Sequence, residues 1–120
     1  MKLLTITVPC YNSEKYMRKC IDSLLPGGED VEILLVDDGS TDKTAEIADE
    51  YAEKYPTIVK AIHKENGGHG SGVNTGIEKA SGLFFKVVDT ADSLLDTAYQ
   101  TILHTLRMFA GVDELLDMLI

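Results

Sequence analysis

The chain has 120 residues, of which 44% are hydrophobic and 26% charged, a composition typical of a globular domain. This length predicts a single domain, residues 1–120, with a core of moderate size. The formal net charge of −9 argues against binding to nucleic acid or to an anionic membrane surface, because both require clustered lysines and arginines.

The N-terminal residues, MKLLTITVPCYN, contain no long apolar segment with a small-residue cleavage site, so we predict no signal peptide. No stretch has the length of a membrane span. Cys10 and Cys20 can pair in principle, but two cysteines in an acidic, helix-rich chain fit a reducing compartment better. The predicted location is therefore cytoplasmic.

Strand and helix signals alternate along the chain. Apolar, β-branched runs predict strands at residues 3–9, 31–37, 57–63 and 83–89. Apolar residues at helical spacing predict helices at residues 16–24, 47–55, 73–80 and 99–109. PGG at 26–28 is expected to end the first helix, and Pro56 the second. Residues 111–120 either approach a further strand or form a final short helix.

This alternation predicts an α/β fold with a parallel sheet, because strand–helix–strand units have right-handed crossovers. The strands are apolar over most of their length, as expected when helices cover both faces of a sheet. Ligands of such sheets bind beyond the carboxyl ends of the strands. Polar residues gather at those ends, at positions 9–12, 37–40, 64–72 and 89–92. The sequence therefore predicts a ligand site along this edge.

Two common nucleotide-binding motifs are absent from the predicted edge. The first strand-to-helix turn reads PCYNSE and has no glycine, which excludes a GxGxxG dinucleotide motif. The glycine cluster at 67–72 leads into VNTG with no lysine, which excludes a P-loop. These glycines either let the backbone approach a ligand or form only a mobile loop.

Four segments, taken in order, resemble the nucleotide-sugar half of family 2 glycosyltransferases. They read VPCYNSEKYMRKCIDSLL, ILLVDDGSTDKTAEIADEYA, KENGGHGSGVNTGIEKASG and FFKVVDTAD. The resemblance implies a GT-A-like (Rossmann-like) parallel sheet flanked by helices, in strand order 3-2-1-4, without the acceptor-binding half. It also implies transfer of a sugar from a nucleoside-diphosphate donor, usually a UDP-sugar, with inversion at the anomeric carbon and help from Mg²⁺ or Mn²⁺.

By position, the resemblance places Pro9, Tyr11 and Asn12 around the nucleoside. It assigns Asp38, the second carboxylate of VDDGS, to the uracil ring, whose N–H a carboxylate can meet with a charge-assisted hydrogen bond. Without the resemblance, a turn or helix cap would be the simpler interpretation of Asp38. Asp37 is expected to orient the backbone of the same turn.

The resemblance places Asn66, Gly67 and Gly68 beside the ribose and diphosphate, with a hydrophilic turn as the alternative. Lys64 and His69 are candidates to approach phosphate, although a lone lysine or histidine is more often a solvated surface group.

The metal site implied by the resemblance departs from the family pattern. The family's fourth strand ends in D-x-D, whereas this chain has Asp89, Thr90 and Ala91, followed by Asp92. Hard oxygen ligands suit Mg²⁺ or Mn²⁺, so Asp89 and Asp92 are the predicted ligands, and Asp89 is also a predicted nucleotide-sugar contact. Because residues i and i+3 of a strand do not project to one side, a turn must bring Asp92 round.

Family enzymes continue beyond this length, and their later part supplies acceptor contacts and the general base. Nothing aligns Asp113, Glu114 or Asp117 with that base, so these carboxylates are expected to form a solvated acidic face, and the catalytic base stays unknown. The acceptor, a saccharide, lipid or protein, is not specified by the sequence. A half-fold exposes apolar surface, which predicts a homo-oligomer.

Two functions of different class follow. The first is an inverting, family 2-like glycosyltransferase represented by a short or truncated chain. The second is a nucleotide-sugar-binding domain without transfer activity of its own. A purely structural or interaction domain is the weaker third, because the polar loops converge on one edge without structural need.

Overall fold

A computed structural model gives the backbone of residues 2–119 and the side chains of residues 2–111 and 118. Its four strands are β1 (Leu4–Cys10), β2 (Val31–Asp38), β3 (Val59–Lys64) and β4 (Phe84–Val87). They form one sheet in the order β3-β2-β1-β4, and every neighbouring pair is parallel. The predicted α/β class and the strand order 3-2-1-4 are confirmed.

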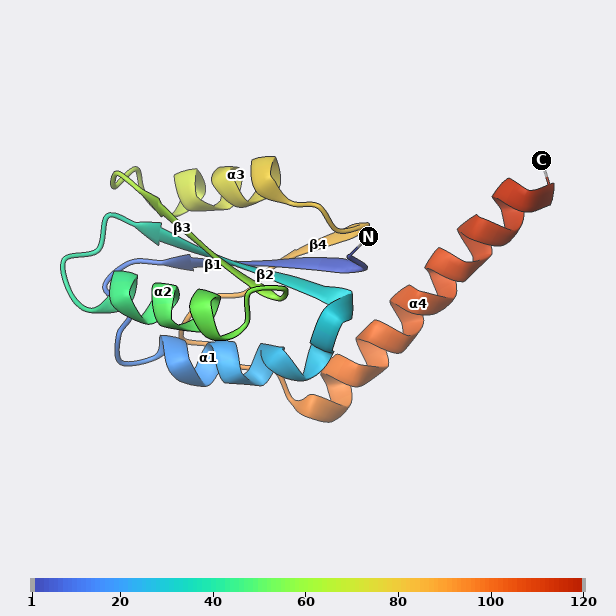
Figure 1. Ribbon diagram of the computed structural model, residues 1–120, viewed down its shortest axis with the longest axis horizontal. Coiled ribbons are helices and arrows are strands. Elements are labelled where there is room, and N and C mark those ends of the chain that lie inside the picture. The colour runs from blue at the N-terminus through green and yellow to red at the C-terminus, as the bar shows by residue number, and fades with distance from the viewer. Residues whose placement is uncertain (1, 120) are drawn as a thin grey trace.

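Helices cover both faces of this sheet (Figure 1). The helices are α1 (Met17–Leu24), the 3-10 helix η1 (Leu25–Asp30), α2 (Thr44–Lys54), α3 (His69–Lys79) and α4 (Asp96–Leu119). Helices α1 and α2 lie on one face and α3 on the other, while α4 projects away from the sheet (Figure 1). Within the described residues, no helix combines the length and hydropathy that a membrane crossing needs.

Strand β1 presents a different kind of side chain to each face. Alternate residues of a strand point to opposite sides, and Leu4, Ile6, Val8 and Cys10 enter the main apolar core. Thr7 and Pro9 instead lie under α3, which meets them through Gly76 and Gly72. A Cβ atom at Gly76 would collide with the Thr7 side chain, so this glycine lets the helix approach the sheet closely.

The helix boundaries differ from the predicted ones by a few residues in several places. Helix α3 begins at His69 rather than at residue 73, since the Gly72 amide already donates to the Gly68 carbonyl at 3.2 Å. Helix α1 ends at Leu24, as predicted, and the PGG segment that follows lies in η1, a 3-10 helix interrupted by Gly28 at φ 62°. Residues 111–119 form neither a strand nor a separate short helix, but the last turns of α4. Gly111 alone is too weak a helix breaker to end it.

Candidate functional site

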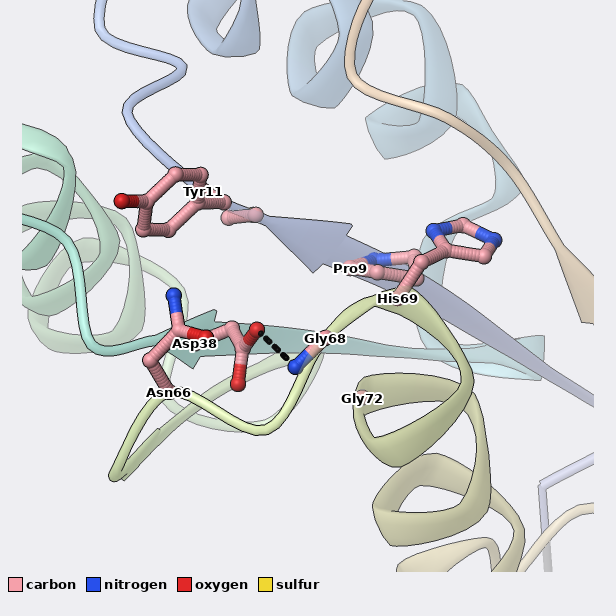
Figure 2. A pocket seen from close by; sticks show the side chains of 8 residues that line it. Pro9, Tyr11, Asp38, Asn66, Gly68, His69 and Gly72 are labelled. Carbon is pink, nitrogen blue, oxygen red and sulfur yellow. Dashed lines mark hydrogen bonds between the residues drawn. The ribbon is translucent and has the colours of Figure 1, made fainter.

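A cavity of about 300 Å³ lies at the carboxyl edge of the sheet, where the sequence predicts a ligand site. Residues from the ends of β1 and β2 and from the β3–α3 connection line it: Pro9, Cys10, Tyr11, Asp38, Asn66, Gly68, His69 and Gly72. Figure 2 shows the Tyr11 ring and the Asp38 carboxylate across the site from the His69 imidazole. The volume is at the small end of the range for ligand sites.

Asp38 is the last residue of β2, and its side chain is only 6% exposed. Its Oδ1 accepts hydrogen bonds from Lys64 Nζ at 2.9 Å and from the Gly67 amide at 2.8 Å, and its Oδ2 accepts from the Gly68 amide at 2.9 Å (Figure 2). The Lys64 hydrogen bond, aided by the two amides, holds the pKa of Asp38 below its ordinary value. Asp38 is therefore ionised at neutral pH and fixes the loop that follows β3.

This carboxylate keeps capacity for a ligand. A carboxylate oxygen has two lone pairs, and Oδ1 uses both for Lys64 and Gly67. Within the described residues, Oδ2 accepts only the Gly68 hydrogen bond. One acceptor position of Asp38 is thus left to meet an N–H group in the cavity.

Asp37 points to the opposite face from Asp38, because successive residues of a strand alternate. Its Oδ1 accepts from the Ser40 amide at 3.1 Å, which confirms that Asp37 orients the turn after β2. Gly39 lies in this turn at φ 69°, and a Cβ atom there would lie 2.7 Å from the Asn66 nitrogen. A glycine is needed at this position for both reasons, since the turn packs directly on the β3–α3 loop.

Asn12 joins two loops and does not line the cavity. Its amide donates to Ser40 Oγ at 3.0 Å, and its Oδ1 accepts from the Thr41 amide at 2.8 Å. It adopts φ 46°, a left-handed conformation that asparagine tolerates better than most residues. In this structure Asn12 ties the loop that carries Tyr11 to the turn after β2.

Asp89 and Asp92 lie in a turn beyond β4, outside the cavity lining. The Asp92 amide donates to the Asp89 carbonyl at 3.0 Å, so the chain does turn between the two carboxylates. Thr90 Oγ1 donates to Ser13 Oγ at 3.0 Å and ties this turn to the loop after β1.

The donor set of this turn restricts how a metal could bind. Both aspartates are exposed, and no three His, Cys, Asp or Glu residues of the described chain are grouped to hold a metal. Mg²⁺ is often held by one or two carboxylates together with substrate phosphates. Asp89 and Asp92 therefore fit a divalent ion only where a ligand's phosphates complete its coordination.

The structure thus groups most of the predicted site residues. Pro9, Tyr11, Asp38, Asn66 and Gly68 line one cavity, and Gly67 contributes its amide to Asp38. Asn12 and Asp89 stand outside the lining. Sequence reasoning overlooked Cys10 as a lining residue, although strand alternation places it beside Pro9 with its thiol toward the core. Burial raises the pKa of this thiol, so Cys10 stays protonated, and both cysteines are free.

Comparisons with known proteins find relatives over most of the chain. A model of the family described as Glycosyl transferase family 2 matches residues 5–106. The chain is 43% identical over 99 residues to EpsJ, an uncharacterized glycosyltransferase of Bacillus subtilis. This alignment covers 82% of the chain and 28% of EpsJ.

Two solved structures show the same fold. S. aureus TarS 1–349 in complex with UDP-GlcNAc superposes with a TM-score of 0.69 at 35% identity, covering 95% of this chain and 32% of that one. The mannosyltransferase PcManGT from Pyrobaculum calidifontis, in complex with GDP-Man and Mn²⁺, superposes with a TM-score of 0.73 at 24% identity, covering 83% and 30%. The chain spans less than a third of each of these relatives.

Proposed function

Since the chain belongs to glycosyl transferase family 2, we propose that residues 1–120 are the domain of a glycosyltransferase that binds the nucleoside-diphosphate sugar donor, a UDP-sugar. The observation that carries this proposal is the cavity at the carboxyl edge, in which an ionised Asp38 keeps one acceptor position beside the exposed ring of Tyr11. TarS, whose structure contains UDP-GlcNAc, supports the choice of a uridine nucleotide.

The proposal gives a role to five of the residues that line the cavity. The Tyr11 ring, 53% exposed, offers a flat apolar face on which a base can stack. Asp38 Oδ2 accepts the ring N–H of uracil, which a carboxylate does with a charge-assisted hydrogen bond. Pro9 packs under the nucleoside, and Asn66 and Gly68 lie beside the ribose and diphosphate.

Asp89 and Asp92 would hold Mg²⁺ or Mn²⁺ together with the donor phosphates. When bound, this ion supplies charge stabilisation to the departing diphosphate. The turn that carries both aspartates is linked through Thr90 and Ser13 to the loop that carries Tyr11.

A second candidate function is donor binding without independent transfer. Ala91 favours it, because this position lacks the carboxylate that the family pattern uses to keep a metal against the diphosphate. In this proposal, the contacts to the acceptor and the general base that would deprotonate it come from parts of the protein other than the cavity described here.

Thermal unfolding with added nucleotides tests the proposal. A ligand that binds only the native state raises the melting temperature, so UDP and UDP-GlcNAc should raise it with increasing concentration. GDP, matched in charge but different in base, should do so much less. Equal effects of UDP and GDP would contradict the uracil assignment, and no effect of either would contradict donor binding. Measuring UDP release from UDP-sugars with a panel of acceptors then distinguishes the two functions: release favours the glycosyltransferase, and its absence favours donor binding without transfer.

A further inference from the structure

Strands β2 and β3 place two pairs side by side, each made of an acidic residue on β2 and a basic residue on β3. Their register sets Asp37 beside His63 and Asp38 beside Lys64. Because neighbouring residues of a strand point to opposite faces, the Asp38–Lys64 pair faces the cavity loop and the Asp37–His63 pair faces α2. The first pair belongs to the proposed donor site, whereas the second has no role in it so far.

His63 lies between two carboxylates. Its Nδ1 is 3.0 Å from Asp37 Oδ2, and its Nε2 is 2.7 Å from Asp49 Oδ1 on α2. An ionised carboxylate only accepts hydrogen bonds, so both ring nitrogens must carry a proton to satisfy both contacts. A neutral imidazole would direct one lone pair at a carboxylate. The geometry therefore favours the imidazolium.

The contacts of Asp37 extend this bridge into the donor site. Asp37 Oδ1 accepts from the Ser40 amide at 3.1 Å, and Ser40 Oγ accepts from the Asn12 amide at 3.0 Å. A chain of contacts thus runs from Asp49 on α2 through His63 and Asp37 to the turn that follows Asp38 and to the loop that carries Tyr11.

We propose that protonated His63 is a positioning residue of the donor site, which holds the turn after β2 in place, and that nucleotide affinity falls when His63 loses its proton. This inference rests on the proposed donor-binding function. Loss of the proton turns one ring lone pair toward Asp37 or Asp49. The bridge from α2 to the turn that Asp37 orients through Ser40 is then broken, and this turn loosens.

The direction of the pH dependence follows from the groups around the ring. Asp37 from β2 and Asp49 from α2 face the imidazole, and their hydrogen bonds, with that of Asp37 foremost, raise the pKa of His63 above its ordinary value of about 6.5. The ring is 42% exposed, so solvent screens part of this attraction. The contribution of His63 is therefore complete at acidic pH and is lost as the pH rises through its raised pKa.

The test is UDP affinity by calorimetry from about pH 6 to about pH 9, which brackets a raised histidine pKa. All proteins carry His69→Gln, because His69 also lines the cavity and the comparison is meant to isolate His63. Affinity should fall about three- to tenfold with rising pH, the scale of one weakened hydrogen-bond network. The added variant His63→Gln should show the lower affinity throughout, while His104→Gln, an exposed histidine on α4, is the matched control and should behave as its parent.

Nitrogen NMR of the ligand-free protein gives a second readout. Both ring nitrogens of His63 should be protonated at neutral pH, and the Ser40 amide should shift with the same midpoint as the ring. Asp49→Asn should lower this midpoint, because it removes one of the two carboxylates while leaving an acceptor for Nε2.

Three results would overturn the positioning role: a neutral His63 ring at neutral pH, a Ser40 amide that does not shift with the ring, or equal UDP affinity of His63→Gln and its parent at the acidic end of the series. Absence of UDP binding at every pH would overturn the donor-binding function and the positioning role with it. UDP binding without pH dependence would overturn the positioning role alone.

Discussion

Asp38 and Lys64 occupy the same register position of adjacent parallel strands, and Lys64 Nζ lies 2.9 Å from Asp38 Oδ1. The same oxygen accepts the Gly67 amide, so one carboxylate joins the end of β2, the end of β3 and the loop that follows. Both side chains are largely removed from solvent, and removing one partner would leave the other charge poorly compensated. The cavity therefore depends on this pair for its shape as well as for ligand contacts.

Replacing Asp38 should abolish most of the rise in melting temperature that UDP causes. Asp38→Asn keeps the side-chain size but removes the charge and one acceptor, so the loop amides and uracil both lose a partner. Lys64→Met should weaken UDP binding less, because the carboxylate stays. Lys60→Met is the matched control. Lys60 lies on the same strand as Lys64 and pairs with Glu32 of β2 at 2.9 Å, and neither residue lines the cavity. A normal UDP response in Asp38→Asn would remove the uracil assignment.

The pH dependence of stability should show the lowered pKa of Asp38. A carboxylate with a depressed pKa in the folded state adds stability above its unfolded value, about 3.9, and loses it as the pH falls through the folded value. Between about pH 5 and about pH 3 the wild type should therefore lose more unfolding free energy than Asp38→Asn. Urea unfolding at a series of pH values measures this difference, and parallel curves for the two proteins would contradict it.

Helix α3 should not tolerate a side chain at Gly76. A Cβ atom there meets the buried Thr7 side chain, so Gly76→Ala should cost about 1–3 kcal/mol of unfolding free energy. Gly70→Ala is the matched control in the same helix: nothing lies within 4 Å of its Cβ position, and alanine favours helix by up to about 1 kcal/mol. Thr7→Ala should relieve Gly76→Ala, so that the double variant is more stable than the sum of the two single effects predicts. Simple additivity in urea unfolding would show that the two residues do not clash.

The strands and the polar residues at their carboxyl ends could be predicted from local patterns in the sequence. The sheet order and the cavity residues were implied by the family resemblance. The pairing of Asp37 with His63 and of Asp38 with Lys64 could not be predicted, since the register of parallel strands is set by how the crossover helices pack. The start of α3 was misplaced for a related reason. Glycine disfavours a helix locally, but Gly72 and Gly76 are needed where α3 rests on β1.

Exposed apolar side chains on α4 are the predicted contact of the homo-oligomer. Met108 and Phe109, both about 60% exposed, belong to α4, the helix that projects away from the sheet (Figure 1). Size exclusion with light scattering should show a dimer or larger species at working concentration. Phe109→Glu should shift the distribution toward monomer, and Thr105→Glu, an exposed polar residue one turn earlier, should not. A monomeric wild type at all concentrations would contradict the prediction.

Restoring a carboxylate at residue 91 should strengthen Mn²⁺-dependent UDP binding. Asp89 and Asp92 are exposed and separated by a turn, so an aspartate at residue 91 would give the ion a second carboxylate next to Asp89, in the i, i+2 spacing of the family pattern. UDP affinity measured with and without Mn²⁺ should therefore rise in Ala91→Asp only when the ion is present. Ala91→Asn, of equal size but without charge, is the matched control and should gain much less. Asp92→Ala in the wild-type chain should weaken UDP binding only with Mn²⁺.

Because the gain concerns donor binding and supplies no general base, Ala91→Asp should not raise the rate of sugar transfer toward an enzymatic value of about 1 s⁻¹ or more. An Ala91→Asp gain that is independent of Mn²⁺ would show that the new carboxylate acts on the protein or the nucleotide and not through the ion.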